Sequence, residues 1–422
     1  MIEKSSRNPW LLVKAIGFRS VTIFFILYIF PFPLTLISAF EPITQLYSDG
    51  CKSLVVWVAD HVLLLSKPIV LFDSDIGDKV FDFVFLFTVT LISLLTATIW
   101  SILDRKNAKH EIVRHWLLVI VRYYLATAMV FYGTAKIFHL QMPPPTLFEL
   151  VQPFGDKTPM GLAWSYIGFS AGFSAFVGWV ELLGGLLLFF RKTSTLGALV
   201  VATVMLNVVV MNLAFEIPVK LYSSLLLLMA IFLIQPDMDR LTRVLLLNKL
   251  AQPRLYREYL IARWQRITAL VVKIVFIASV LIGNIASCFE RVQKHGKNRA
   301  VSPLYGIYDT ERFILNGDTL APITTDSKRW QQLIMDFPDH AHIKFMNDSV
   351  VYCPIQWNIR DRKIVLSPGH PNEKSIFAYK RLLKSLQLEG TIGSDSVKIT
   401  LRERDLKSFN LINTEFRWIQ EY

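Results

Sequence analysis

Six polar residues interrupt long apolar runs and are the first candidates for chemistry: Arg122, Lys136, Glu181, Asn207, Asn212 and Glu216. The clearest case is Glu181, in the middle of FVGWVELLGGLLLFF at residues 176–190. A carboxylate is costly in such a run unless it has a partner or a function. Glu181 either belongs to a structural ion pair that fixes helix register, or it titrates or binds a ligand in a cavity. Both interpretations predict that Glu181 faces protein.

Helical spacing groups these residues into stripes. Residues Arg122, Met129, Gly133 and Lys136 recur along one face of WLLVIVRYYLATAMVFYGTAKIF. A second stripe lies on or beside Gly168, Gly172, Ala175, Gly178, Glu181 and Gly185. Small residues let neighbouring backbones approach closely, so this second face is expected to pack inside a helix bundle.

Depth along the helices predicts the partners. At 1.5 Å per residue, Arg122 and Glu181 lie roughly 9 Å and 13 Å above the inner edges of their runs, so an Arg122–Glu181 pair is expected. The same arithmetic brings Lys136 to the level of Glu216. Asn212 lies one turn below Glu216 on the same face, and Asn207 lies deeper on a different face.

No cofactor or metal motif is evident. Cys51, Cys288 and Cys353 form no C-x-x-C pair, so ordinary thiols are expected, with at most one structural disulfide. No histidine pair is placed within the apolar runs to ligate a haem. His340 and His342 alternate on a strand and should share a face, but a third metal ligand is missing. A quinone could still bind between helices without any motif.

The elements that must position these residues are membrane helices. The chain has 422 residues, of which 53% are hydrophobic and only 18% are charged, as in polytopic membrane proteins. Seven apolar runs are long enough to cross a bilayer, near 18–40, 80–102, 116–138, 167–190, 195–215, 219–235 and 267–287. Pro31 and Pro33 should break the helix of the first run. We expect this run to be a membrane span that is retained, not a signal peptide that is cleaved.

Charge gives the orientation. Lysine and arginine gather in alternate loops, from Lys4 and Arg7 through Arg105, Lys106, Arg191 and Lys192 to the stretch between Arg240 and Arg266. The positive-inside rule therefore predicts a cytoplasmic N-terminus and a C-terminus on the outer side. Most of the net charge of +12 comes from these loops and is explained by membrane orientation. The expected partner is therefore the lipid bilayer and not nucleic acid.

Two further segments lie on the predicted outer side. LVVWVADHVLLLSKPIVLF, at residues 54–72, is interrupted by polar residues and predicts an amphipathic surface or re-entrant helix. Residues 289–422 show short alternating stretches separated by turn signals such as Asn316-Gly317, Asn347-Asp348, Pro368-Gly369 and Glu389-Gly390. They predict an all-β domain of about eight strands, either a lipocalin-like barrel or a sandwich, with one helix around SKRWQQLI.

Residues 113–234 resemble the DoxX-like four-helix membrane module. The resemblance rests on Arg122, on FYGTAKIF with Gly133 and Lys136, on the outer loop MPPPTLFELVQPFG, and on VELLGGLLLFFRK and the two helices after it. The ending FNLINTEFRWIQEY resembles the tail of longer bacterial proteins that join this module to a periplasmic domain. The expected domains are 1–112 with two spans and the outer segment, 113–238 as the module, 239–288 with a basic cytoplasmic segment and the last span, and 289–422 as the periplasmic β domain.

Three functions fit this architecture. The favoured one is a non-enzymatic scaffold or assembly factor of the bacterial inner membrane, whose outer β domain binds a protein or lipid partner. The second is a membrane subunit of a quinone-linked oxidoreductase, a role that the resemblance to DoxX and DoxD proteins implies. The third is a transporter of a small acid or lipid along Arg122, Glu181, Lys136 and Glu216; it is weakest because no inverted repeat is visible.

Overall fold

The computed structural model describes residues 9–69, 77–104, 110–253, 258–296, 299–367, 374–413 and 418–419. The chain forms two compact units. The helical unit comprises Met1–Gln141 and Gly172–Phe289, and the barrel unit comprises Met142–Ala171 and Glu290–Tyr422. Several residues used for orientation, including Lys4, Arg7, Arg105 and Lys106, and the Pro368-Gly369 turn lie outside the described residues.

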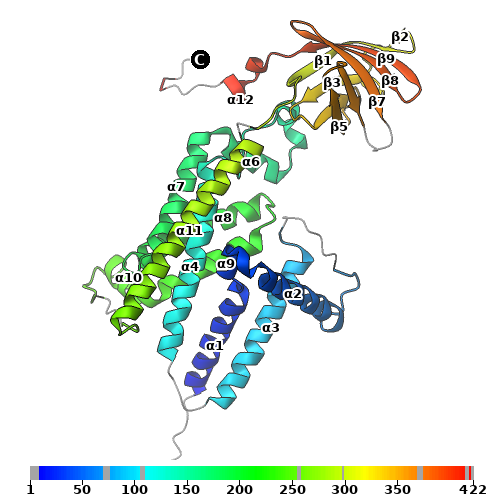
Figure 1. Cartoon of the computed structure of the whole chain (residues 1–422). Coiled ribbons are helices and arrows are strands. Elements are labelled where there is room, and N and C mark those ends of the chain that lie inside the picture. The colour runs from blue at the N-terminus through cyan, green and yellow to red at the C-terminus, as the bar shows by residue number, and fades with distance from the viewer. Residues whose placement is uncertain are drawn as a thin grey trace, which may run out of the picture. The chain divides into compact units, whose positions relative to one another are not determined.

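Seven helices are long and apolar enough to cross a membrane, which confirms the predicted helical region (Figure 1). They are built from α1 Pro9–Ile29, α3 Val80–Leu103, α4 His110–Ile137, α7 Ala171–Leu188, α8 Ser194–Ala214, α9 Lys220–Ile234 and α11 Arg263–His295. The first membrane-length segment is Ala15–Leu36, and the sixth, Lys220–Leu245, continues from α9 through α10. Shorter helices are α2 Glu41–His61, α5 Leu147–Val151, α6 Pro159–Phe169, α10 Met238–Leu245 and α12 Asn410–Asn413. Single 3₁₀ turns occur at Leu34–Leu36, Ser38–Phe40, Phe154–Asp156, Gln235–Asp237 and Leu406–Ser408.

Helix boundaries differ from the apolar runs at three places. As predicted, α1 ends at Ile29, immediately before the proline-rich stretch. The amphipathic segment predicted at 54–72 is helical only up to His61, as the last part of α2, which begins at Glu41; residues 62–69 are not helical, and residues 70–72 lie outside the described residues. The fourth run is divided, because Ser170 has extended backbone angles and separates α6 from α7. Gly168 therefore belongs to a different helix from Gly178 and Glu181.

The core of the helical unit lies between α1, α4, α7, α8 and α9. Its fully buried side chains include Leu125, Met129, Leu188, Phe189 and Met229. Apolar faces on all of these helices meet in this one core, which is what a bundle of membrane helices requires.

Residues 306–403 form a closed antiparallel barrel of eight strands, and this confirms the lipocalin-like barrel over the sandwich (Figure 1). The strands are β1 Gly306–Leu315, β3 Trp330–Met335, β4 His340–Phe345, β5 Val350–Asn358, β6 Lys363–Leu366, β7 Ser375–Arg381, β8 Ser385–Ile392 and β9 Asp395–Glu403. Pairing of β9 with β1, from Glu403 opposite Tyr308 to Val397 opposite Leu315, closes it. A two-residue strand, β2 Asp318–Thr319, adds a hairpin to β1.

Two local predictions in the barrel are wrong. The expected helix at SKRWQQLI is instead the strand β3, whose alternation is hidden because residues on both of its faces are buried. The expected turn at Glu389-Gly390 lies within β8, where a Cβ on Gly390 would stand 1.9 Å from the carbonyl oxygen of Ile376. Glycine is needed there for close strand approach rather than for a turn.

The segment Met142–Ala171, here called the α5–α6 segment, belongs to the barrel unit. Leu147 of α5 packs against Ile307 of β1 and Ile334 of β3, and all three side chains are buried. These contacts cover the outer face of β3. A loop between two membrane helices is thus part of the fold of the barrel unit.

Candidate functional site

The centre of the helical unit holds a buried ion pair between Lys136 of α4 and Glu181 of α7. Lys136 Nζ donates to Glu181 Oε1 at 2.5 Å, and the two side chains are only 6% and 1% exposed. The prediction that Glu181 faces protein is therefore confirmed. Glu181 Oε2 is also buried, with no hydrogen-bond partner among the described residues.

Glycine packing brings the two helices together at this pair. A Cβ on Gly133 would lie 2.7 Å from the carbonyl oxygen of Gly178, and one on Gly178 would lie 2.6 Å from that of Gly133. Ser174 of α7 donates its hydroxyl to the carbonyl oxygen of Lys136 at 3.0 Å. The close approach that the small residues predicted is thus present, and it sets the register in which Lys136 meets Glu181.

The predicted Arg122–Glu181 pair is wrong. In the observed register Lys136 is about 6 Å along the helix axis from Glu181, whereas Arg122 is about 15 Å away. Arg122 instead lines a small cavity of about 70 Å³ together with His115 of α4 and Arg191 after α7. The depth argument failed because the inner edges of the two runs are not level. Gly185 of α7 packs against Ala126 and Met129 of α4, so α7 ends at Leu188, level with the middle of α4.

The other predicted polar residues do not join the pair. Asn212 is buried and donates to the hydroxyl of Ser223 at 3.0 Å, which links α8 to α9. Asn207 is exposed on α8, and Glu216 is exposed in the turn after α8, where its φ is 54°. Of the six candidates, the structure therefore brings only Lys136 and Glu181 together.

Tyrosines surround the pair on one side. Lys136 Nζ lies 5.9 Å from the centre of the Tyr132 ring, and the Tyr132 ring lies 6.2 Å from that of Tyr222 on α9. These tyrosines are only partly buried, so the ion pair lies beside a half-buried aromatic surface.

Two polar contacts escaped sequence reasoning. Arg19 of α1 is buried and pairs with Asp104 after α3 at 3.1 Å. Asp78, before α3, accepts hydrogen bonds from the backbone N–H groups of Lys220 and Leu221 at 2.7 and 3.0 Å. It thus caps the first turn of α9 across the fold. Neither pairing leaves a local pattern, because the partners are far apart in sequence.

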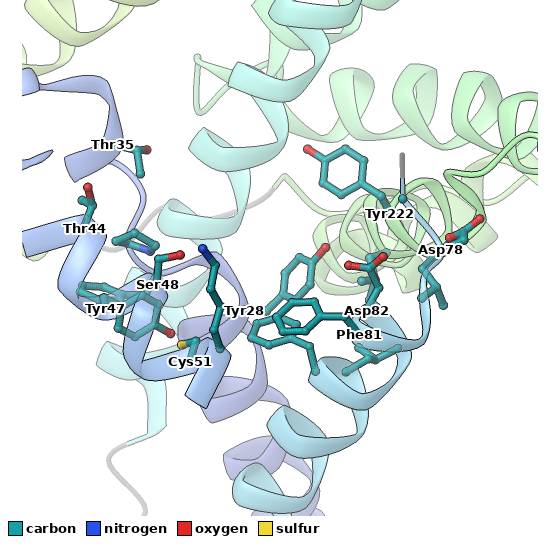
Figure 2. A pocket seen from close by; sticks show the side chains of 18 of the residues that line it. Tyr28, Thr35, Thr44, Tyr47, Ser48, Cys51, Asp78, Phe81, Asp82 and Tyr222 are labelled. Carbon is teal, nitrogen blue, oxygen red and sulfur yellow. The ribbon is translucent and has the colours of Figure 1, made fainter. Parts of the chain in front are cut away.

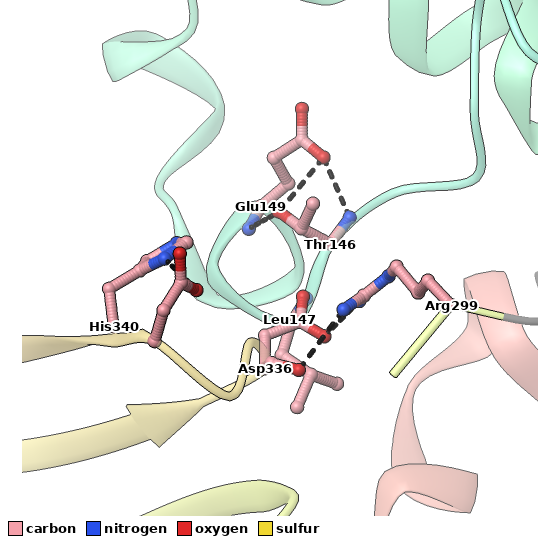
Figure 3. Close-up of polar contacts among 7 residues, drawn as sticks. Thr146, Leu147, Glu149, Arg299, Asp336 and His340 are labelled. Carbon is pink, nitrogen blue, oxygen red and sulfur yellow. Dashed lines mark hydrogen bonds and ion pairs between the residues drawn. The ribbon is translucent and has the colours of Figure 1, made fainter. Parts of the chain in front are cut away.

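In the barrel unit, a buried carboxylate fixes the α5–α6 segment. Asp336, at the end of β3, accepts a hydrogen bond from the backbone N–H of Leu147 at 3.0 Å and pairs with Arg299 (Figure 3). Thr146 and Glu149 complete a capping box at the start of α5. The helix is therefore held to the barrel at its first turn.

Aromatic and histidine rings cover the neighbouring outer face of β4 and β5. His340 and His342 share this face as predicted: the Phe148 ring stacks on His342 with centres 4.6 Å apart, and the His340 ring lies 4.8 Å from Tyr352. Burial, and then the charge of His340, lower the pKa of His342. Among the described residues, no group of three potential metal ligands occurs. The face is therefore a packed aromatic surface.

The cysteines are Cys51, Cys288 and Cys353, and each is a free thiol. Cys353 is in the barrel core, and burial raises its thiol pKa to about 12. A protonated, enclosed thiol is a poor nucleophile, so Cys353 packs as a small apolar residue.

Comparison with known proteins gives one similarity without a known function. The uncharacterized protein YwoB of Bacillus subtilis (strain 168) is 26% identical over 144 residues, which cover 32% of this chain and 86% of YwoB. No family model matches the chain. No solved structure matches it.

Proposed function

We propose that this chain is a DoxX-like protein of the bacterial inner membrane and acts as a non-enzymatic scaffold or assembly factor. Its N-terminus is cytoplasmic, and its barrel binds a protein partner on the periplasmic side. Seven membrane-length helices and the alternation of basic loops support this arrangement.

The observation that carries the proposal is the filling of the barrel. Inward-facing side chains such as Tyr308, Phe313, Trp330 and Phe377 are buried in one continuous apolar core. An eight-stranded barrel is just wide enough to be filled in this way. Recognition by this unit therefore falls to its outer surface.

The polar pair in the membrane unit supports the same function. Lys136 and Glu181 neutralise each other inside a glycine-packed contact, as expected of a structural pair. The route that a transporter would need is not supported, because Arg122 and Glu216 are elsewhere in the unit.

Tyr352 on β5 is the residue from which to test partner binding. Its side chain is 54% exposed on the aromatic face, beside the exposed Val350. A photoreactive amino acid at position 352 should crosslink one defined protein in intact cells. The same probe at the exposed Ile376 on β7 is the matched control. A scaffold would be refuted if position 352 gave no crosslink beyond that of position 376.

Reporter fusions test the orientation. A periplasm-dependent reporter should be active after Tyr422 and inactive after Lys249. Activity after Lys249 would contradict the proposed topology.

A quinone-linked oxidoreductase subunit is the alternative. The buried oxygen of Glu181 that has no hydrogen-bond partner among the described residues, near Tyr132, favours it, because reduction of a quinone requires groups that exchange protons. Mass spectrometry of the protein purified in mild detergent separates the two functions: a stoichiometric quinone would replace the scaffold proposal.

A further inference from the structure

We propose that the helical unit binds one membrane phospholipid in a pocket between α1, α2, α3 and α9, with the lipid phosphate at Lys52. The pocket has a volume of about 600 Å³, within the usual range for small-molecule sites. Its walls include Tyr28 of α1, residues of α2, Phe81 and Phe85 of α3, and Leu225 of α9. This site goes beyond the proposed function and does not depend on the barrel.

The position of the pocket along the helices fits a lipid headgroup. It lies where α1 ends at Ile29, where α3 begins at Val80 and where α9 begins at Lys220. Ends of membrane-length helices lie near the interface between hydrocarbon and water. A ligand there meets both an apolar and a polar environment.

One wall of the pocket suits an acyl chain. Phe81 and Phe85 stack with ring centres 6.4 Å apart, and Tyr28 lies 6.3 Å from Phe85. Leu225 and Tyr222 of α9 continue this wall. The surface is mostly aromatic and aliphatic, so it can bury hydrocarbon.

The opposite wall, on α2, suits a phosphate. Thr44, Ser48 and Lys52 are spaced four residues apart and therefore lie on one stripe of the helix. Figure 2 shows Thr44 and Ser48 on this wall, with Thr35 nearby. Thr44 Oγ1 donates to the carbonyl oxygen of Glu41 at 3.0 Å, so the Ser48 hydroxyl and the Lys52 ammonium are the phosphate donors of this wall.

The ammonium of Lys52 is available for such a ligand. Among the described residues its one ion pair is with Asp49, at 3.8 Å, which is longer than a hydrogen bond. Its side chain is 39% exposed, so a ligand can reach it.

Two carboxylates at the far end of the pocket fix the direction in which the lipid lies. Asp78 caps α9, and Asp82 accepts from the backbone N–H of Lys79 at 2.8 Å (Figure 2). Both carboxylates accept hydrogen bonds in helix caps, and such acceptors offer no donor to a phosphate. The phosphate therefore belongs at the α2 wall. A neutral quinone would make no use of Lys52.

Native mass spectrometry of the full chain, purified in mild detergent and washed of loose lipid, tests the proposal. The unaltered protein should retain one phospholipid per chain. Lys52→Glu should reduce that occupancy roughly tenfold or more, since it replaces attraction by repulsion. Lys67→Glu, which changes an exposed lysine outside the pocket lining, is the matched control and should retain the lipid.

A second variant keeps the test decisive if Lys52→Glu does not fold. Ser48→Trp fills the pocket without changing charge, and it should also displace the lipid. Inorganic phosphate alone should not bind, since it cannot use the aromatic wall. Equal lipid retention in Lys52→Glu and Lys67→Glu, retention in Ser48→Trp, or a bound quinone in place of a phospholipid would each overturn the proposal.

Discussion

Replacing either member of the Lys136–Glu181 pair should destabilise the helical unit strongly. The atoms Nζ and Oε1 are 2.5 Å apart. At an effective dielectric constant of about 20, their Coulomb attraction is on the order of 7 kcal/mol, most of which offsets the cost of removing both charges from water. Removing one partner leaves the other charge without compensation, at a cost of about 3–5 kcal/mol.

The single variants Lys136→Met and Glu181→Leu should therefore lower the melting temperature in detergent by roughly 6–20 °C, for about 2–4 °C per kcal/mol. The double variant should recover most of the loss, because an apolar pair can replace an ion pair of similar volume.

Fluorescence-detected size-exclusion chromatography gives the melting temperatures of the four proteins: the unaltered chain, the two single variants and the double variant. Arg122→Gln combined with Glu181→Leu is the control, and its two losses should simply add. Additive losses in the Lys136→Met/Glu181→Leu double variant would refute the reasoning. Recovery of the melting temperature in the Arg122→Gln/Glu181→Leu variant would instead support the Arg122–Glu181 pair predicted from the sequence.

Three further outcomes can be checked. Gly178→Val should separate α4 from α7 and prevent recovery of a monodisperse protein, whereas Gly283→Ala, at a site with nothing within 4 Å of its Cβ, should be tolerated. Asp336→Ala should release α5 from the barrel, and hydrogen exchange should rise selectively in the α5–α6 segment. Cys353 should resist alkylation at pH 9 in the folded protein, because its pKa of about 12 keeps the thiol protonated, while the half-exposed Cys51 reacts; reaction of Cys353 at the rate of an unfolded control would contradict the packing described.

Periodicity in the sequence predicted the elements but not all of their contacts. Apolar runs gave the seven membrane-length helices, and the Asn316-Gly317 turn, where both residues have positive φ, was readable as a hairpin. Asn347-Asp348 likewise lies between β4 and β5. These signals are local, so a single sequence contains them.

The partner of Glu181 depended on register, which an apolar run does not define. The depth argument took the inner edges of the two runs as level, but α7 ends at Leu188, level with the middle of α4, so Arg122 was placed too close to Glu181. The better signal was the pair Gly133 and Gly178, since glycines that meet across two helices fix the level of every neighbouring residue. That signal still required knowing which helices are adjacent.

The α5–α6 segment was beyond sequence reasoning for a different reason. Its contact with the barrel joins Leu147 to Asp336, which are 189 residues apart. Covering β3 also removed the alternation by which a strand is recognised, so Trp330–Met335 resembled a helix. Long-range packing here changed the local pattern itself.

Closure of the barrel limits how other chains can bind to it. Each of the eight barrel strands pairs on both sides, because β1 contacts both β3 and β9. Among the described strands, the one that ends the sheet is β2, which is only two residues long. An incoming peptide therefore has no long edge to extend by strand addition, and the same closure protects the unit from edge-to-edge aggregation. A partner must recognise side chains on the barrel wall rather than its backbone.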